Sequence, residues 1–164
     1  MKFLILSSLF IPLTLLPKNN NPSFARIIST ERSQIVDRKW EMQEIRFLYD
    51  NVPYYYNRDD YSVSNMNFDN DNIIFYSDGS GIYHQSDNLE FQLKWHFIKC
   101  KNNAVSFTIS KFRNNSDLIV NWENIELSTN SIKYTEYYTH ENGLHTLGYG
   151  IRISKDTSCT VINL

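Results

Sequence analysis

Two histidines near the C-terminus have the spacing that most favours metal chemistry. His140 and His145 flank Asn142-Gly143, the strongest short turn signal in the chain, and a two-residue hairpin loop would place them opposite each other. Histidines whose Cβ atoms lie about 5 Å apart can share a metal ion. The string is one residue too long for the helical zinc-protease motif, however, and Glu141 is the sole further ligand beside it. We interpret the pair as an exposed hairpin tip and expect neither a metal nor a cofactor.

Carboxylates gather at two places in the middle of the chain. The run from Asp69 to Asn72 resembles a calcium loop, but an EF-hand needs Gly at position six and Glu at position twelve, where this chain has Ile74 and Ser80. Asp59 and Asp60 are adjacent, so their carboxylates point apart and do not form an acid–base pair. Both clusters are interpreted as solvated turns.

Motifs for nucleophilic catalysis and for phosphate binding are missing from the sequence. The stretch from Ser77 to Gly81 is a hairpin turn rather than a nucleophile elbow. We therefore expect a protein that is not an enzyme. The alternative is an isomerase or hydrolase that uses a cavity carboxylate, such as Glu44 or Glu136.

The two cysteines of the chain, Cys100 and Cys159, form an even pair. In an oxidising compartment such a pair predicts a disulfide. The bond would close a loop of about 60 residues and contribute about 4 kcal/mol to stability, while fixing the C-terminal tail.

The N-terminus has the pattern of a signal peptide. Lys2 precedes an uncharged apolar run from Phe3 to Leu16, and Pro17 ends it. The run is shorter than the roughly 20 residues that span a bilayer, and small residues lead up to Ala25, where we expect cleavage. Residues 1–25 are thus predicted to be a leader and residues 26–164 the mature domain, exported to the periplasm or secreted, with no membrane contact after cleavage.

Composition limits the partners of the mature chain. The formal net charge is −2 and the sequence has no basic stripe, so nucleic-acid binding is not expected. Aromatic residues make up 15% of the chain, which favours pleated strand surfaces.

Short alternating runs separated by polar turns predict an all-β fold. In the clearest run, from Leu89 to Phe97, every second residue is apolar. The nine predicted runs are Trp40 to Tyr49, Tyr61 to Phe68, Ile73 to Tyr76, Gly81 to His84, Leu89 to Phe97, Ala104 to Phe112, Leu118 to Leu127, Ile132 to His140 and Leu144 to Ile153.

Turn signals join these runs as hairpins. A two-residue turn at Asp78-Gly79 would pair Tyr76 with Gly81 and Phe75 with Ile82. Hairpin connections leave no room for crossover helices, so the sheet is predicted to be an antiparallel meander.

About eight strands in this order can close into an up-and-down barrel. A two-sheet sandwich is the alternative. Residues 29–36 are the one helix candidate and are expected to plug an end of the barrel as a short helical turn.

Several weak motifs follow one another in a fixed order between Val36 and Ile153. They are Lys39-Trp40-Glu41, Asn67-Phe68 to Gly81, Leu93-Lys94-Trp95, and Ile125-Glu126-Leu127-Ser128 before Ile132-Lys133-Tyr134. In this order and spacing they resemble the lipocalin-like domains of secreted Bacteroidetes-type proteins. The resemblance implies an eight-stranded antiparallel barrel with the first-strand Trp closing its base, and a cavity that takes small apolar molecules in some relatives.

The chain departs from that family in three respects. Arg38-Lys39-Trp40 replaces the Gly-x-Trp of lipocalins, the Thr-Asp-Tyr motif of the larger relatives is missing, and too few residues follow Ile153 for a C-terminal helix. The resemblance also implies that Arg152 stacks on Trp40, within about 6 Å of its ring centroid.

We expect a non-catalytic binding module that holds a small apolar or amphipathic ligand inside the barrel. Its candidate lining residues are Trp40, Phe75, Phe91, Leu93, Trp95, Phe107 and Tyr134. Tyr54 to Tyr56 and Tyr137-Tyr138 are candidates for the cavity mouth. The alternative is an exported accessory or interaction protein, of unknown protein partner, whose barrel is filled by its own side chains.

Overall fold

The protein is built almost wholly of β-strands. The computed structural model describes residues 33–98, 103–113, 115–139 and 145–155. Within them, residues 33–35 form a helical turn, and the named elements follow. These are β1 (Lys39–Tyr49), β2 (Val52–Asn57), the 3₁₀ turn η1 (Tyr61–Val63), β3 (Asn72–Phe75), β4 (Ser80–His84), β5 (Glu90–Phe97), β6 (Val105–Arg113), β7 (Ser116–Leu127), β8 (Ser131–Thr139) and β9 (His145–Ile153).

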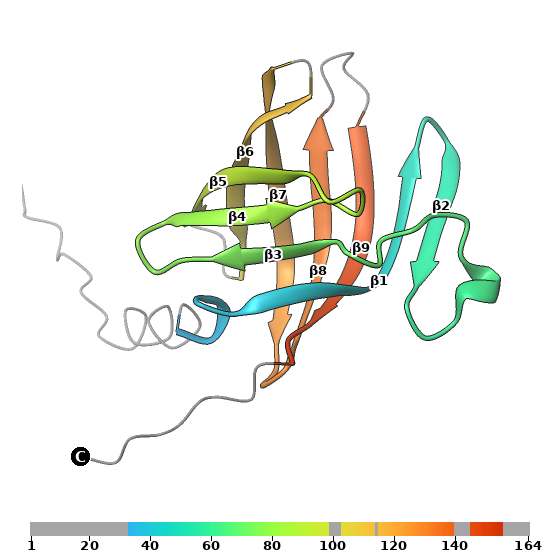
Figure 1. Cartoon of the computed structure of the whole chain (residues 1–164), viewed down its shortest axis with the longest axis horizontal. Coiled ribbons are helices and arrows are strands. Elements are labelled where there is room, and N and C mark those ends of the chain that lie inside the picture. Colours follow the sequence, from blue (N-terminus) through green and yellow to red (C-terminus); the bar gives the residue numbers. More distant parts are fainter. Residues whose placement is uncertain (1–32, 99–102, 114, 140–144, 156–164) are drawn as a thin grey trace, which may run out of the picture.

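The strands form one antiparallel sheet that closes on itself. Its order is β2-β1-β3-β4-β5-β6-β7-β8-β9, and β1 also pairs with β9. That last pairing closes β1 and β3 to β9 into an eight-stranded barrel, with β2 outside the ring (Figure 1). The predicted all-β barrel in meander order is therefore confirmed, and the sandwich alternative is excluded. As predicted, a short helical turn precedes β1, and the described residues contain no helix after β9.

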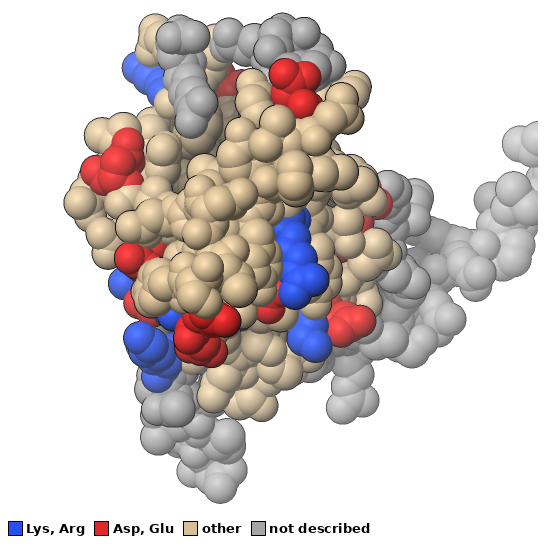
Figure 2. Space-filling view, turned by 90° about the vertical axis from the view of Figure 1, so that its right-hand side faces the viewer, with Lys and Arg blue, Asp and Glu red and all other residues tan. Residues whose placement is uncertain are grey.

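Charged side chains are interspersed on the side of the molecule that carries β2. Figure 2 shows Lys and Arg scattered among Asp and Glu over a large uncharged surface.

Among the residues that the structure describes, no helix is long and apolar enough to cross a bilayer.

Strand β1 changes its partner along its length. Lys39 to Glu41 pair with β3, whereas Glu44 to Tyr49 pair with β2, and the opposite edge pairs with β9. A register shift between Met42 and Glu44 marks a bulge, and bulges bend the strand that contains them. Beyond this bulge the β1–β2 hairpin leans away from β3 (Figure 1).

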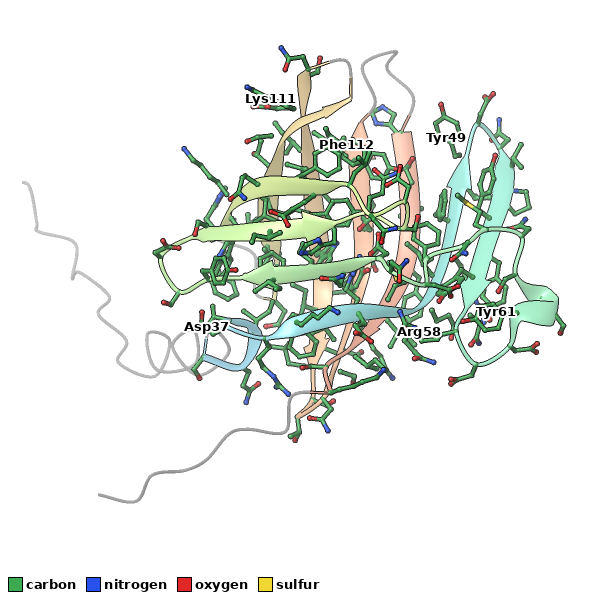
Figure 3. The ribbon with its side chains drawn as sticks, in the orientation of Figure 1. Asp37, Tyr49, Arg58, Tyr61, Lys111 and Phe112 are labelled. Atoms are coloured by element: carbon green, nitrogen blue, oxygen red, sulfur yellow. The ribbon has the colours of Figure 1, made fainter. Side chains whose placement is uncertain are left out.

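Arg58 stabilises the junction between the β1–β2 hairpin and the rest of the barrel (Figure 3). Its Nε donates to the carbonyl of Met42 at 2.8 Å and its Nη1 to Glu41 Oε2 at 3.0 Å. Its Nη2 donates to the carbonyl of Asp69 at 2.8 Å. The forked geometry of one guanidinium thereby links β1 to the loop between β2 and β3.

The strand predicted from Tyr61 to Phe68 is wrong. That segment holds η1 and a loop, and the strand lies earlier, at β2. The missed signal is the two-residue turn Asp50-Asn51, whose φ angles of 50° and 60° fit a type I′ hairpin turn. Pro53 and three consecutive tyrosines concealed the strand because they do not alternate apolar with polar residues.

The hairpin between β3 and β4 differs from its predicted register by one residue. Phe75 pairs with Gly81 rather than with Ile82. Gly79 has a φ of 91°, the left-handed conformation needed where a three-residue loop ends in a G1 bulge. The predicted two-residue turn at Asp78-Gly79 is wrong because this bulge adds a loop residue.

Strands β8 and β9 form the other predicted hairpin, and His145 pairs with Thr139. The predicted pairing of His145 with His140 is therefore wrong. His140 itself and the turn at Asn142-Gly143 lie outside the described residues, as do the leader (residues 1–25) and both cysteines of the predicted disulfide, Cys100 and Cys159.

The outer edge of β2 is covered by polar groups from the following loop. Asn65 accepts from the N–H of Tyr55 through Oδ1 at 2.8 Å, and its own N–H donates back to the Tyr55 carbonyl at 3.0 Å. Asn65 Nδ2 donates to the Pro53 carbonyl at 3.1 Å, and Ser64 Oγ accepts from the N–H of Asn57 at 3.0 Å. The loop thus replaces a neighbouring strand.

One end of the barrel, here called the closed end, is filled by aromatic side chains. Phe75 is fully buried and contacts the rings of Trp95, Phe107 and Trp122 at centroid distances of 5.3, 5.7 and 5.6 Å. The helical turn covers these rings, since Ile35 is buried in the same cluster. The turns β3–β4 and β7–β8, the end of β5 and the start of β6 lie at this end.

Candidate functional site

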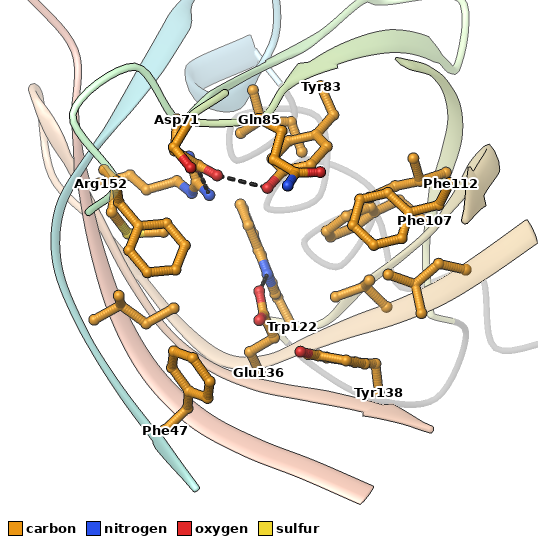
Figure 4. A pocket seen from close by; sticks show the side chains of 18 of the residues that line it. Phe47, Asp71, Tyr83, Gln85, Phe107, Phe112, Trp122, Glu136, Tyr138 and Arg152 are labelled. Atoms are coloured by element: carbon orange, nitrogen blue, oxygen red, sulfur yellow. Dashed lines mark hydrogen bonds and ion pairs between the residues drawn. The ribbon is translucent and has the colours of Figure 1, made fainter. Parts of the chain in front are cut away.

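A cavity of about 560 Å³ lies inside the other half of the barrel (Figure 4). Sites for small molecules have volumes of about 300 to 1,000 Å³. Most of the wall is apolar. The apolar lining side chains are Met42, Ile45, Phe47, Met66, Phe68, Ile73, Phe107, Ile109, Phe112, Leu118, Val120 and Trp122.

The cavity opens at the end of the barrel that carries the β1–β2 and β4–β5 turns, the start of β7 and the start of β9, which we call the open end. Its polar lining residues there are Gln85 and Ser86, after β4, and Ser116 and Asp117, at the start of β7. The β1–β2 hairpin contributes Phe47 and Tyr54, whose rings stack at 5.1 Å, so the rim combines aromatic faces with polar groups.

A buried ion pair forms part of the cavity wall. Arg152 Nη2 donates to Asp71 Oδ1 at 2.6 Å, and the two side chains are only 4% and 1% exposed. Tyr83 donates through its hydroxyl to Asp71 Oδ2 at 2.5 Å, and burial next to this carboxylate raises the pKa of Tyr83 well above its ordinary value. Each charge is therefore compensated and hydrogen-bonded, as burial requires.

Arg152 reaches the base of the barrel in a different way from the one predicted. Its Nη1 donates to the carbonyl of Trp40 at 3.1 Å, and its guanidinium carbon lies 5.6 Å from the ring centroid of Trp122. The cation over the Trp40 ring is Arg38, at 4.9 Å. The prediction that Arg152 stacks on the Trp40 ring is thus wrong, because its guanidinium points inward toward Asp71 and lies near the Trp122 ring instead.

Glu136 is an accessible carboxylate in the interior of the cavity, whereas Asp117 lies at its exposed rim. Its Oε2 accepts from Trp122 Nε1 at 2.8 Å, and no described residue donates to its Oε1. Burial raises the pKa of Glu136; the Trp122 N–H and Arg152 oppose this shift, and Asp71 adds to it. The side chain is half-buried and lines the cavity, so its free oxygen is within reach of a bound molecule.

Six of the seven predicted lining residues belong to the buried hydrophobic core. One of these six, Phe107, also lines the cavity. Phe91 is partly buried and packs on this core, with its ring 5.2 Å from that of Phe112. The structure therefore packs most of the seven beside the cavity rather than around it. The exceptions are Phe107, which lines the cavity, and Phe91, which lies near the β4–β5 turn and contacts two lining residues, Tyr83 and Phe112.

The residues around the cavity include several that sequence reasoning missed. Ile109 and Leu118 stand at inward positions of their alternating strands. Periodicity predicts that they face the barrel interior, but it does not predict that the interior is empty there. Of the predicted mouth tyrosines, Tyr54 and Tyr138 line the cavity. Glu44 lies away from it and forms an ion pair with Arg46 at 2.8 Å.

A closed eight-stranded antiparallel barrel whose cavity opens at one end is consistent with a lipocalin-like fold. Comparisons of the chain with protein-family models, curated proteins and solved structures find no match. In the described part of the chain, no group of three or more His, Cys, Asp or Glu side chains is placed to hold a metal ion. Function is therefore argued from the cavity itself.

Proposed function

We propose that the protein is an exported, non-catalytic binding module of the Bacteroidetes-type lipocalin-like class, which holds a small amphipathic ligand in its barrel. The observation that supports this is the cavity of about 560 Å³ with an apolar wall and few polar groups, the usual composition of a ligand pocket. A barrel filled by its own side chains would leave voids of about one water molecule.

The polar groups of the cavity favour binding over catalysis. Asp71 and Arg152 neutralise each other and are almost fully covered, so neither is free to exchange a proton with a substrate. Glu136 is bound on one oxygen by Trp122, and the remaining acidic lining side chain, Asp117, lies at the exposed rim, where its Oδ1 accepts from the backbone N–H of Lys111. Acid–base chemistry on a bound molecule usually needs a second carboxylate that is free to act with the first.

Two adjacent residues of β7 allow a matched test. Leu118 lines the cavity, whereas Ile119 is 58% exposed on the outer face. We expect Leu118→Trp to fill the cavity and weaken binding of the neutral fluorescent probe N-phenyl-1-naphthylamine by about tenfold, as one bulky group removes contact area worth more than 1 kcal/mol. Ile119→Trp should leave probe binding unchanged.

Native mass spectrometry of the protein from its own host supplies the second measurement. A bound mass that is lost in Leu118→Trp and kept in Ile119→Trp supports the proposal. A ligand-free mass together with probe binding that ignores Leu118→Trp would contradict it and favour the accessory-protein alternative.

A further inference from the structure

The charges around the cavity are unequal. Its lining contains three acidic side chains, Asp71, Asp117 and Glu136, and one basic side chain, Arg152. Asp71 and Arg152 cancel each other in a contact of 2.6 Å. A molecule inside the cavity therefore meets an excess of negative charge.

The accessible charge is the carboxylate and not the guanidinium. Arg152 donates through Nε to Tyr134, through Nη1 to Trp40 and through Nη2 to Asp71, and its side chain is only 4% exposed. A ligand anion thus finds little of Arg152 to bind. Glu136, by contrast, presents Oε1 to the cavity with no donor from any described residue.

The burial of Glu136 raises the free-energy cost of a carboxylate charge that has no cationic partner. Trp122 supplies one neutral N–H to Oε2, and burial raises the pKa of Glu136. A buried carboxylate is stabilised when a cation forms a charge-assisted hydrogen bond with it. Figure 4 shows Glu136 between Trp122 and Tyr138, with apolar side chains across the cavity from it.

We propose that the ligand of this cavity is a cationic amphiphile, a primary amine on a hydrocarbon body, whose ammonium group donates to Oε1 of Glu136. The hydrocarbon would lie against the apolar wall toward Ile109 and Leu118. This inference rests on the proposed binding function and narrows its ligand class. It excludes fatty-acid anions as the preferred ligand, because their carboxylate would face Glu136.

Three probes with the same chain and different head groups test the ligand class: octylamine, 1-octanol and octanoate. Isothermal titration calorimetry of the purified protein near neutral pH should give the order octylamine, octanol, octanoate from tightest to weakest. Glu136→Gln keeps the shape and removes the charge, and should weaken octylamine by about tenfold. Octanol affinity should stay within about twofold.

Glu126→Gln is the matched control, because Glu126 is an exposed carboxylate on the outer face of β7. It should leave all three affinities unchanged. Octanoate binding more tightly than octylamine, or an octylamine affinity unaffected by Glu136→Gln, would overturn the ligand class while the binding function stands. Failure of all three probes and of N-phenyl-1-naphthylamine would overturn the binding function as well.

Discussion

The two ends of the barrel are built from the same alternating strands and differ in how their interiors are filled. At the closed end Phe75 contacts three aromatic rings within 6 Å. At the open end, Ile109 and Leu118 on the neighbouring strands β6 and β7 pair with each other and face the cavity. An eight-stranded barrel is only just wide enough to be filled by side chains, so side-chain size and the leaning β1–β2 hairpin decide which end is solid.

Truncating one inward side chain at each end should give the largest contrast. We expect Phe75→Ala to lower the free energy of unfolding by about 3 to 5 kcal/mol, because a fully buried ring leaves a cavity in a packed core. Leu118→Ala should cost about 1 kcal/mol, since Leu118 already faces open space. Urea unfolding followed by tryptophan fluorescence measures both. Equal losses would show that the open end is as tightly packed as the closed end.

Two inward glycines on β9 sharpen the comparison. A Cβ at Gly150 would collide with the ring of Tyr134, which is stacked at 3.9 Å on Trp122 and has no room to move. Gly150→Ala should therefore cost about 1 to 3 kcal/mol through overpacking.

Gly148 is the control, because it stands two residues nearer the open end. A Cβ there would meet Phe47 Cβ at 3.1 Å and the Arg46 carbonyl at 3.3 Å, which are looser contacts than those at Gly150. Gly148→Ala should cost less than about 1 kcal/mol. Thermal unfolding gives both values, and a larger loss at Gly148 than at Gly150 would contradict the assignment of the rigid end.

The smallest expected effect is the contribution of Glu136 to the pH dependence of stability. This residue lies between the closed end and the open end of the barrel. Because burial raises its pKa in the folded state, folding binds a proton there, and stability falls as pH rises through the unfolded pKa of about 4.3 toward the higher folded value. Glu136→Gln should unfold like the wild type at acidic pH and become relatively more stable toward neutral pH. A difference between the two proteins that is constant with pH would refute this.

Alternation and the turn signals together predicted an antiparallel meander and most of its core, with a closed barrel as the favoured arrangement and a sandwich as the alternative. Trp40, Phe75 and Leu93 stand at inward positions of amphipathic runs, and each is buried. Glu136 could be named as a cavity carboxylate because it stands two residues from Tyr134 in such a run. Periodicity reports which face of the sheet a side chain occupies, and this was enough for these residues.

The remaining features depend on events that leave little trace in the sequence. The ion pair joins Asp71 and Arg152, which are 81 residues apart, so neither residue identifies the other. Strand β1 changes partner at the bulge after Met42, and Met42 itself lines the cavity. A bulge is a local change of backbone and does not alter the apolar pattern enough to be seen.

The covered edge of β2 has a consequence for the behaviour of the protein in concentrated solution. Exposed strand edges are templates on which further chains add by strand pairing, and this is a common route to fibrils. Here Ser64 and Asn65 occupy outward backbone groups of β2, and each of the other strands pairs with two neighbours over at least part of its length. The edge of β2 therefore offers fewer free backbone groups on which the strand of a second chain could add.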